Sequence, residues 1–366
     1  MCIDFGLRMN NLDTCSVGFL WDPSLETFDF GSKHPIKVGR FQMVRDFLAN
    51  NDFLSQPNVE ILKPEPLPEK LLKKTHAQRY LDAVKKMSET GEGEIAIDTP
   101  AFKGIFENAS ITSGATITGV RAVASGKFQH FLSPTGGFHH AKFEWGGGFC
   151  IFNDVAAAVY ELKELGFHRV LIADFDVHHG NGTQTYFYDD PEVMQISFHE
   201  DPEWMYPHDG FIEDIGTDSG RGYNINMPFP MDSCDGVYKY AFDEIVPDLV
   251  EFYQPEFIIF LPGFDAHYRD RLAHLNLTTN MINYITAFFH DAAHNFSAGR
   301  IGVLAGGGYT NDSFKWGIGV VMSVLSGFRY EPPTQTPPFK DDEETWEIVR
   351  GNVEKVKALV FPQLGI

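Results

Sequence analysis

One stretch of the chain indicates the fold class most directly: Val170-Leu171-Ile172-Ala173-Asp174-Phe175-Asp176-Val177-His178-His179-Gly180-Asn181-Gly182. It opens with an apolar run that shows no polar alternation, which is typical of a strand buried on both faces. A dense polar group follows the run at once. The predicted strand and four similar runs are Arg169–Phe175, Phe131–Leu132, Val193–Phe198, Phe257–Leu261 and Ile301–Leu304.

Helical patterns separate these runs, and the predicted helices are Asp154–Leu165, Val237–Phe252, Thr278–Ser297 and Ser313–Leu325. Alternation of strands and helices predicts an α/β fold with a central, mostly parallel sheet flanked by helices on both faces. The first third is more helical, with helices expected at Val38–Leu54, Glu69–Met87 and Phe106–Ser125. We find no repeat or long linker, so we expect one domain over residues 1–366. It has an N-terminal loop segment over about 9–32 and a C-terminal helix over about 343–359.

Composition narrows the function. The longest apolar run, Phe257–Phe264, is far short of the roughly 20 residues that a membrane-spanning helix needs. No secretory signal is evident at Met1, so we expect a cytoplasmic protein with no membrane partner.

The cysteines, widely spaced without a CxxC pair, are expected to be reduced thiols: Cys2, Cys15, Cys150 and Cys234. A net charge of −21 argues against nucleic acid. The charge is compatible with a cationic substrate, although a role in solubility alone is the favoured interpretation.

Ligands of α/β sheets bind in loops beyond the carboxyl ends of the strands, and the polar clusters follow predicted strands in this way. Asp176 and His178 are two residues apart, so in an extended segment both side chains face one side. They could chelate a metal ion or belong to a salt-bridged loop. Asp265 follows the strand Phe257–Leu261 and is the natural third ligand, although a helix cap would also explain it. Three protein ligands and a water are typical of catalytic zinc.

Two further clusters fit a reaction at that metal. His139 and His140 follow a glycine pair and suggest a general acid/base pair, unless one of them is structural. Tyr309 follows three glycines that allow close backbone approach, which suits a hydrogen-bond donor to an oxyanion. A phosphate-binding loop is disfavoured because the segment lacks Lys and any GxGxxG or Walker pattern.

Five motifs together resemble the histone deacetylase family, which includes acetylpolyamine amidohydrolases and acetoin-utilisation proteins and shares its fold with arginase. They are Gly-Phe-His-His-Ala-Lys at 137–142, Gly-Phe-Cys-Ile-Phe-Asn-Asp at 148–154, Asp-Phe-Asp-Val-His-His-Gly-Asn-Gly-Thr-Gln at 174–184, Gly-Phe-Asp-Ala-His at 263–267 and Gly-Gly-Gly-Tyr at 306–309. The resemblance covers roughly residues 20 to 330.

The resemblance implies a role for each of these residues. The zinc ligands, which would also accept Fe²⁺, match Asp176, His178 and Asp265. His140 matches the general base, His139 its partner and Tyr309 the residue that holds the oxyanion. Asp174 matches the acid that orients His139, and Asn181 stands where many relatives orient the base with Asp. A neutral Asn should favour the protonated form of that base less than Asp does.

Weaker matches concern the substrate and a second ion. Substrate-binding residues are expected at Phe149 and Tyr206, which match the aromatic walls of an acyl-lysine tunnel, at the rim acid Asp98, and at Gly148 and Leu272. Arg40 matches an arginine of the acetate-exit region. The family's structural K⁺ would lie near Asp174, Asp176, His178, Ser197 and Phe198.

The resemblance implies a zinc-dependent deacetylase that hydrolyses an N-acetyl amide of lysine, a polyamine or another small amine and releases acetate. An arginase-like dinuclear ureohydrolase and a non-catalytic acetyl-ligand binder are the alternatives. Arg271 replaces the proline usual in relatives near the substrate mouth, and the segment 9–32 is expected to fold over that mouth. The oligomeric state stays open, including a homodimer and a homotetramer. The remaining histidines, such as His179, His199 and His267, are expected to be structural or to line the rim.

Overall fold

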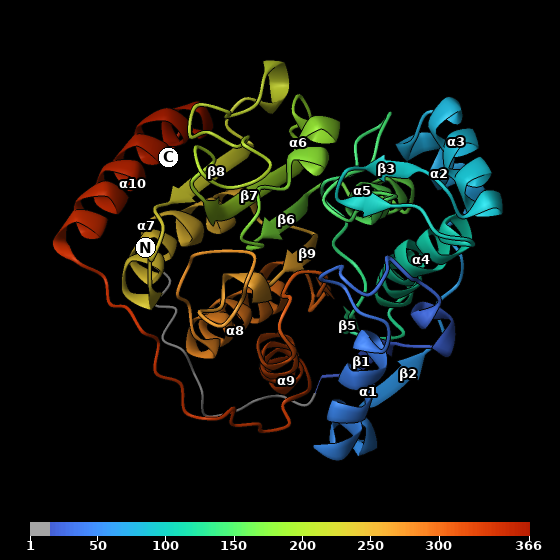
Figure 1. Cartoon of the computed structure of the whole chain (residues 1–366). Helices are drawn as coiled ribbons and strands as arrows, with labels where there is room; N and C mark the ends of the chain where they lie inside the picture. Colours follow the sequence, from blue (N-terminus) through green and yellow to red (C-terminus); the bar gives the residue numbers. More distant parts are fainter. Residues whose placement is uncertain (1–14) are drawn as a thin grey trace.

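A computed structural model describes residues 15–366, and its centre is an eight-stranded sheet with helices on both faces (Figure 1). Every neighbouring pair in the sheet is parallel. The strands lie in the order β2 (Val59–Leu62), β1 (Val17–Leu20), β5 (His130–Ser133), β10 (Ile301–Leu304), β9 (Phe257–Leu261), β6 (Val170–Asp174), β7 (Val193–Glu200) and β8 (Asn224–Phe229).

The central strands are buried on both faces, which explains their unbroken apolar sequences. In β6, Leu171 and Ala173 enter one hydrophobic core, whereas Val170 and Ile172 enter a second core on the other face. Successive side chains of a strand point to opposite faces, so a strand covered on both sides needs apolar residues throughout. The predicted single-domain α/β fold with a mostly parallel sheet is confirmed.

Each core is closed by its own helices. The first core is closed by α7 (Asp235–Tyr253), α8 (Thr279–Phe296), α9 (Asn311–Ser326), α10 (Glu343–Leu364) and part of α1 (Arg40–Asn50). The second core is closed by α2 (Glu69–Thr75), α3 (Gln78–Thr90), α4 (Ile105–Ala124) and α5 (Asp154–Glu164). No helix within residues 15–366 is both long and apolar enough to cross a bilayer. Within the same residues, Cys15, Cys150 and Cys234 are buried and form no disulfide with one another.

Two expectations about the first third were wrong in detail. The helix expected at Glu69–Met87 is two helices, because His76 and Ala77 are extended and bond the backbone of Lys142 and Phe143. The segment 9–32 is not a plain loop in its described part: it contains β1 and the 3-10 helix η1 (Pro23–Glu26). Residues 9–14 lie outside the described part.

Several strands and one helix of the structure were not predicted from the sequence. They are β1, β2, β8, the short helix α6 (Asn181–Phe187) and the hairpin of β3 (Glu94–Ala96) with β4 (Thr99–Pro100). In β1 the four residues are all buried, so burial in the sheet rather than a long apolar pattern stabilises this strand.

Candidate active site

The polar clusters meet because the strands that precede them are neighbours. The strands β5, β10, β9 and β6 lie side by side and are parallel, so their carboxyl ends share one edge of the sheet. The loops after these strands carry His139 and His140, Tyr309, Asp265, and the segment 176–178 respectively. The topology thus brings together residues that are up to 170 positions apart in sequence, from 139 to 309.

Asp176, His178 and Asp265 form a compact buried group of candidate metal ligands. Their ligand atoms all lie within 4.8 Å of one another. His178 Nδ1 is 3.1 Å from Asp176 Oδ1 and 3.2 Å from Asp265 Oδ2. Tetrahedral zinc with bonds of about 2.0–2.1 Å separates its nitrogen and oxygen ligands by roughly 3.3 Å, so the spacing fits.

The charges of the group also favour a cation. Burial and the charge of Asp176 raise the pKa of Asp265 to about 6. Burial opposes a charge on His178, yet its hydrogen bonds to Asp176 and Asp265 raise the pKa of its imidazole to about 10. Two buried carboxylates therefore require positive charge between them, which a divalent ion would supply. Gly307 leaves room there, since a Cβ at this position would lie 2.3 Å from Asp176 Oδ2.

His139 and His140 are a buried pair whose Nε2 atoms lie 3.2 Å apart. His139 Nδ1 donates to Asp174 Oδ2 over 2.8 Å, and His140 Nδ1 donates to Asn181 Oδ1 over 2.9 Å. The Nδ1 atoms thus point toward Asp174 and Asn181, and the two Nε2 atoms point toward each other.

The two imidazoles have opposite pKa shifts. Burial disfavours charge on His139, but the carboxylates of Asp174 and Asp176 raise its pKa to about 9. Burial and the neighbouring charges of His139 and His178 hold the pKa of His140 well below its usual value. Titratable neighbours with separated pKa values are typical of acid/base catalysis.

Tyr309 lies beside the candidate metal group, with its ring centroid 6.5 Å from that of His178. Burial raises the pKa of its hydroxyl well above the usual value, so the hydroxyl stays protonated and can donate. Two contacts hold its loop. Asp270 Oδ2 accepts from the backbone N–H of Tyr309 over 2.6 Å, and the Arg40 guanidinium donates to the carbonyls of Gly308 and Gly306 over 2.5 and 2.9 Å.

The expected aromatic walls flank these groups. The Tyr206 ring is 5.0 Å from His140, and the Phe149 ring is 5.7 Å from Tyr309. Phe149 has φ of 66°, a strained conformation for a side-chain-bearing residue that is typical of functional sites. Gly148 beside it is required by close approach, because a Cβ there would lie 2.2 Å from His140 Cδ2.

Asp98 anchors the loop that carries Phe149. Its Oδ2 accepts from the backbone N–H of Gly148 over 3.0 Å, and Thr99 Oγ1 accepts from that of Phe149 over 3.0 Å. Asp98 lines a cavity of about 530 Å³ that also includes His140 and Tyr206. The Asp98 side chain therefore lines the same cavity as His140 and Tyr206 and also fixes the backbone of Gly148.

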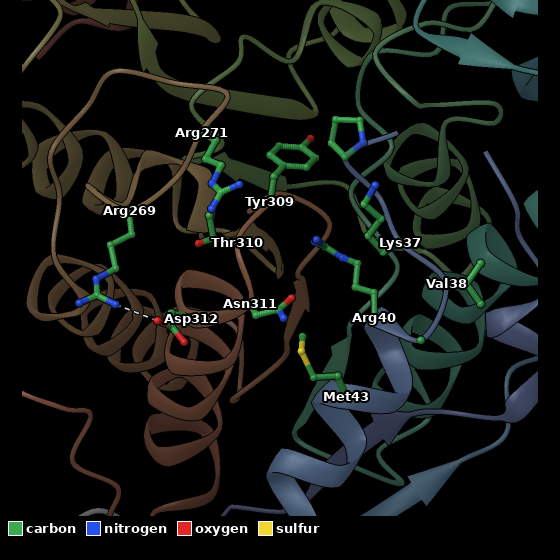
Figure 2. A pocket seen from close by; sticks show the side chains of 12 residues that line it. Lys37, Val38, Arg40, Met43, Arg269, Arg271, Tyr309, Thr310, Asn311 and Asp312 are labelled. Atoms are coloured by element: carbon green, nitrogen blue, oxygen red, sulfur yellow. Dashed lines mark hydrogen bonds and ion pairs between the residues drawn. The ribbon is translucent and has the colours of Figure 1, made fainter. Parts of the chain in front are cut away.

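A second cavity, of about 690 Å³, adjoins Tyr309 and is basic (Figure 2). Arg40 and Tyr309 line it, and Arg271 reaches it from the loop after β9 (Figure 2). The cationic residues that line it are Lys37, Arg40, Arg269 and Arg271. The next residue of that loop, Leu272, is half-buried and donates its backbone N–H to Asp270 Oδ1 over 3.1 Å.

Of the residues expected near a monovalent cation, Asp176 and His178 are themselves candidate metal ligands, and the other three (Asp174, Ser197 and Phe198) lie in the neighbouring strands β6 and β7. Asp174 pairs with Ser197 in the register of β6 and β7, and Phe198 follows in β7. Asp174 Oδ1 accepts from the backbone N–H of Asp176 over 3.2 Å. The residues are neighbours, and all are buried.

Three residues that shape the site were not among those expected from the sequence. Asp154 accepts from the backbone N–H groups of Gly137 and Phe138, and so fixes the loop that leads to the histidine pair. Asp270 positions Tyr309, as described above. His34 packs its ring 4.4 Å from that of Phe149, so a segment just past residue 32 reaches the mouth. Asp154 lies within the motif at 148–154, whereas Asp270 and His34 lie outside all five motifs.

Comparison with known proteins defines the class. The sequence-family model of the histone deacetylase domain matches residues 34–325 of this chain. The chain therefore belongs to the histone deacetylase family of hydrolases, which confirms the resemblance predicted from the five motifs.

Individual relatives come from bacteria and yeast. The chain is 34% identical over 299 residues to acetoin utilization protein AcuC of Bacillus subtilis (strain 168), covering 80% of this chain and 77% of that protein. It is 34% identical to a histone deacetylase-like amidohydrolase of Pseudomonas aeruginosa (74% and 72% covered) and 30% identical to histone deacetylase RPD3 of Saccharomyces cerevisiae (81% and 69% covered). The crystal structure of the HDA15 HD domain superposes with a TM-score of 0.83 at 25% identity, covering 96% of this chain and 97% of that one.

Proposed function

We propose that this protein is a zinc-dependent deacetylase that hydrolyses an N-acetyl amide and releases acetate. The observation that carries the proposal is the convergence of three candidate ligands, a histidine pair and Tyr309 at one edge of the sheet. We include the whole chain, residues 1–366, in one catalytic domain. Its C-terminal helix α10 contributes Val349 and Val353 to the first core.

The candidate ligands Asp176, His178 and Asp265 would hold the metal. When bound, zinc would make a water acidic enough to attack at neutral pH and would polarise the acetyl carbonyl. Fe²⁺ suits the same oxygen and nitrogen donors and is the natural substitute.

The protein's own groups handle protons and charge. Asn181 keeps a proton on Nδ1 of His140, so its Nε2 is the basic atom that takes the proton of the attacking water. The same atom then returns the proton to the departing amine. His139, held by Asp174, supplies positive charge beside it, and the Tyr309 hydroxyl donates to the carbonyl oxygen as negative charge develops.

Other groups hold this arrangement in place. We assign the structural K⁺ to the neighbourhood of Asp174, Ser197 and Phe198, behind the histidine pair. Phe149, Tyr206, Gly148 and Leu272 would contact the substrate, with Asp98 at the rim. Arg40 faces the basic cavity, consistent with a path for acetate anion away from the site.

The alternatives receive less support. A dinuclear ureohydrolase needs a larger ligand set, whereas the group at this edge has three members among the residues that the structure describes. A non-catalytic binder would not need a histidine pair with separated pKa values.

The charges of the residues around the site affect which acetylated amine can bind. The net charge of −21 attracts cations at long range, but exposed charges are screened beyond about 8–10 Å. Arg271, which lines the basic cavity next to Tyr309, stands where relatives usually have proline near the substrate mouth, so it would repel a second ammonium group of a substrate there. We therefore favour acetyl-lysine or a small acetylated amine over an acetylated polyamine.

Acetate release from acetyl-lysine peptide, acetylspermidine, acetylputrescine and small acetylated metabolites tests the proposal. Zinc-loaded enzyme should turn over at least one of them, and a hydroxamate chelator should abolish that turnover. The peptide should exceed acetylspermidine in kcat/KM, and Arg271→Pro should narrow the difference. No acetate from any substrate at full zinc occupancy would reject the acetyl amide as substrate.

A further inference from the structure

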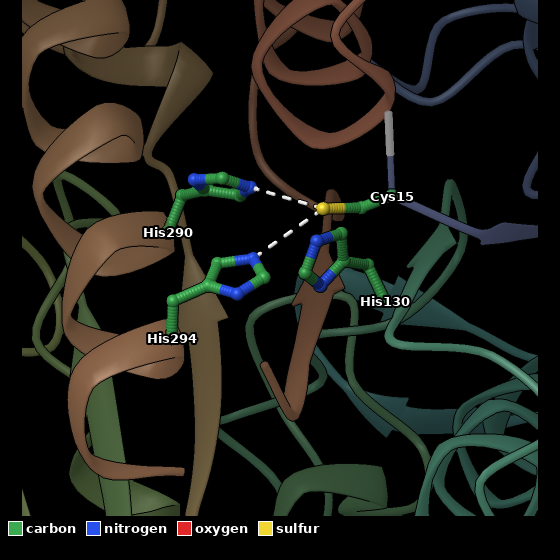
Figure 3. Close-up of side chains that lie close together, drawn as sticks. All are labelled: Cys15, His130, His290 and His294. Atoms are coloured by element: carbon green, nitrogen blue, oxygen red, sulfur yellow. Dashed lines mark hydrogen bonds between the residues drawn. The ribbon is translucent and has the colours of Figure 1, made fainter. Parts of the chain in front are cut away.

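Cys15, His130, His290 and His294 form a second cluster with metal-ligand chemistry, here called the Cys–His cluster (Figure 3). One ligand atom from each residue can be chosen so that all four lie within 4.8 Å of one another. Cys15 Sγ is 3.4 Å from His294 Nε2 and 3.9 Å from His290 Nε2. Tetrahedral zinc bound to thiolate and imidazole separates sulfur from nitrogen by roughly 3.6 Å, which these distances bracket.

The cluster lies at the opposite edge of the sheet from the candidate active site. Cys15 lies two residues before β1, and His130 is the first residue of β5. Gly299, whose carbonyl accepts a hydrogen bond from His130, lies two residues before β10. The four residues of β5 separate the two edges by about 13 Å at roughly 3.3 Å per residue. The two clusters share no residue, so the second cluster does not serve the deacetylation chemistry directly.

The tautomer of His130 leaves one nitrogen for a metal. Its Nδ1 donates to the backbone carbonyl of Gly299 over 2.9 Å, so its Nε2 carries a lone pair. This Nε2 is buried and has no hydrogen-bond partner within the described residues. A metal-binding histidine typically donates its other nitrogen to a backbone carbonyl in this way, whereas an unpaired buried nitrogen is otherwise costly.

The two histidines of α8 are arranged to share a ligand. His290 and His294 are four residues apart, so they lie on one face of the helix, with ring centroids 4.6 Å apart. The Asp291 carboxylate lies 3.5 Å from His290 Nδ1, which leaves Nε2 toward Cys15. Figure 3 shows both rings reaching the thiol from the helix and the His130 ring reaching it from β5.

We propose that the Cys–His cluster is a structural zinc site that joins the chain before β1 to β5 and α8. Four ligands of this kind close the coordination of zinc, as in structural rather than catalytic sites. Cys15, His130 and His290 are buried and His294 is exposed, so the metal has a path of entry. The bound metal fixes the start of β1, whose neighbours β5 and β2 define one half of the sheet.

Metal counting and cobalt spectroscopy on the full-length protein test this proposal. The wild-type chain should bind two zinc ions, and Cys15→Ser and His294→Ala should each bind one while keeping acetate release. Replacement of zinc by Co²⁺ should give a sulfur-to-cobalt charge-transfer absorption that Cys15→Ser abolishes. Cys234→Ser is the matched control, because it removes another buried thiol and should leave the absorption unchanged.

The cobalt signal separates this proposal from the proposed function. The candidate active site has no sulfur ligand, so Asp265→Ala should lose a metal but keep the charge-transfer absorption. Wild-type protein without this absorption, or Cys15→Ser with undiminished zinc content, would overturn the site whatever the deacetylase assay shows. The His294 side chain is exposed, so His294→Ala should fold normally and tests the site even if Cys15→Ser fails to fold.

Discussion

Replacing Asn181 by Asp tests how the histidine pair divides its roles. The structure contains an internal comparison: Asp174 and Asn181 accept from Nδ1 of His139 and His140 over nearly equal distances of 2.8 and 2.9 Å. The imidazole with the charged partner has a raised pKa of about 9, whereas burial holds the pKa of the other well below its usual value. Asn181→Asp gives His140 the charged partner that it lacks.

The magnitude follows from the geometry. Opposite charges about 4 Å apart attract by about 4 kcal/mol at an effective dielectric constant of 20. Carboxylates at such distances typically move a neighbouring pKa by about 1 to 3 units. Because His140 must be neutral to act as base, raising its pKa moves the rising limb of kcat/KM to higher pH by about 1 to 3 pH units.

The assay is acetate release at low substrate concentration across pH, since kcat/KM reports ionisations of the free enzyme. Asn280→Asp is the control, because it adds the same charge at an exposed position on α8 and should leave the profile unchanged. A rising limb that stays in place in Asn181→Asp, with metal content intact, would refute the assignment of His140 as the base.

Three further variants probe the surroundings of the reaction. Tyr309→Phe should lower kcat by about 10²–10³ with KM nearly unchanged, because it removes one oxyanion donor; unchanged turnover would remove Tyr309 from the mechanism. Gly148→Ala should nearly abolish activity while thermal unfolding still shows a folded protein, because its Cβ would lie 2.2 Å from His140 and the residue has φ of 56°. Full activity of Gly148→Ala would show that a Cβ at this position does not displace His140. Asp270→Ala should lower kcat more than it raises KM, because it frees the backbone of Tyr309, and Asp270→Glu should recover part of the loss. Equal losses in both Asp270 variants would favour a purely structural role.

The sequence predicted the elements at the centre of the sheet better than those at its periphery. The strands β9 and β10 begin and end at the predicted residues, because burial on both faces imposes an unbroken apolar run. The convergence of the candidate site residues follows for a related reason, since polar side chains directly after such strands are brought to one edge of the sheet by the topology.

Residues held only by tertiary contacts escaped prediction. The break at His76 and Ala77 exists because a distant loop bonds to the extended backbone there, and no glycine or proline marks it. Asp270 and His34 act from irregular loops, where no periodic pattern exists.

The Cys–His cluster escaped prediction for the same reason. Its members come from positions 15, 130, 290 and 294, and only the last pair has a recognisable spacing. From the sequence, the histidines other than His139, His140 and His178 are expected to be structural or to line the rim. In the proposed zinc site, three of them (His130, His290 and His294) have a structural role that is exerted through a metal.

In the proposed mechanism, amide hydrolysis requires one metal ion held by Asp176, His178 and Asp265. The most direct measurement is the recovery of acetate release when zinc is titrated into chelator-stripped enzyme, compared with Asp265→Ala. We predict no turnover without metal, full recovery in the wild-type protein and none in the variant. Undiminished acetate release by the stripped enzyme, or by Asp265→Ala, would contradict the account.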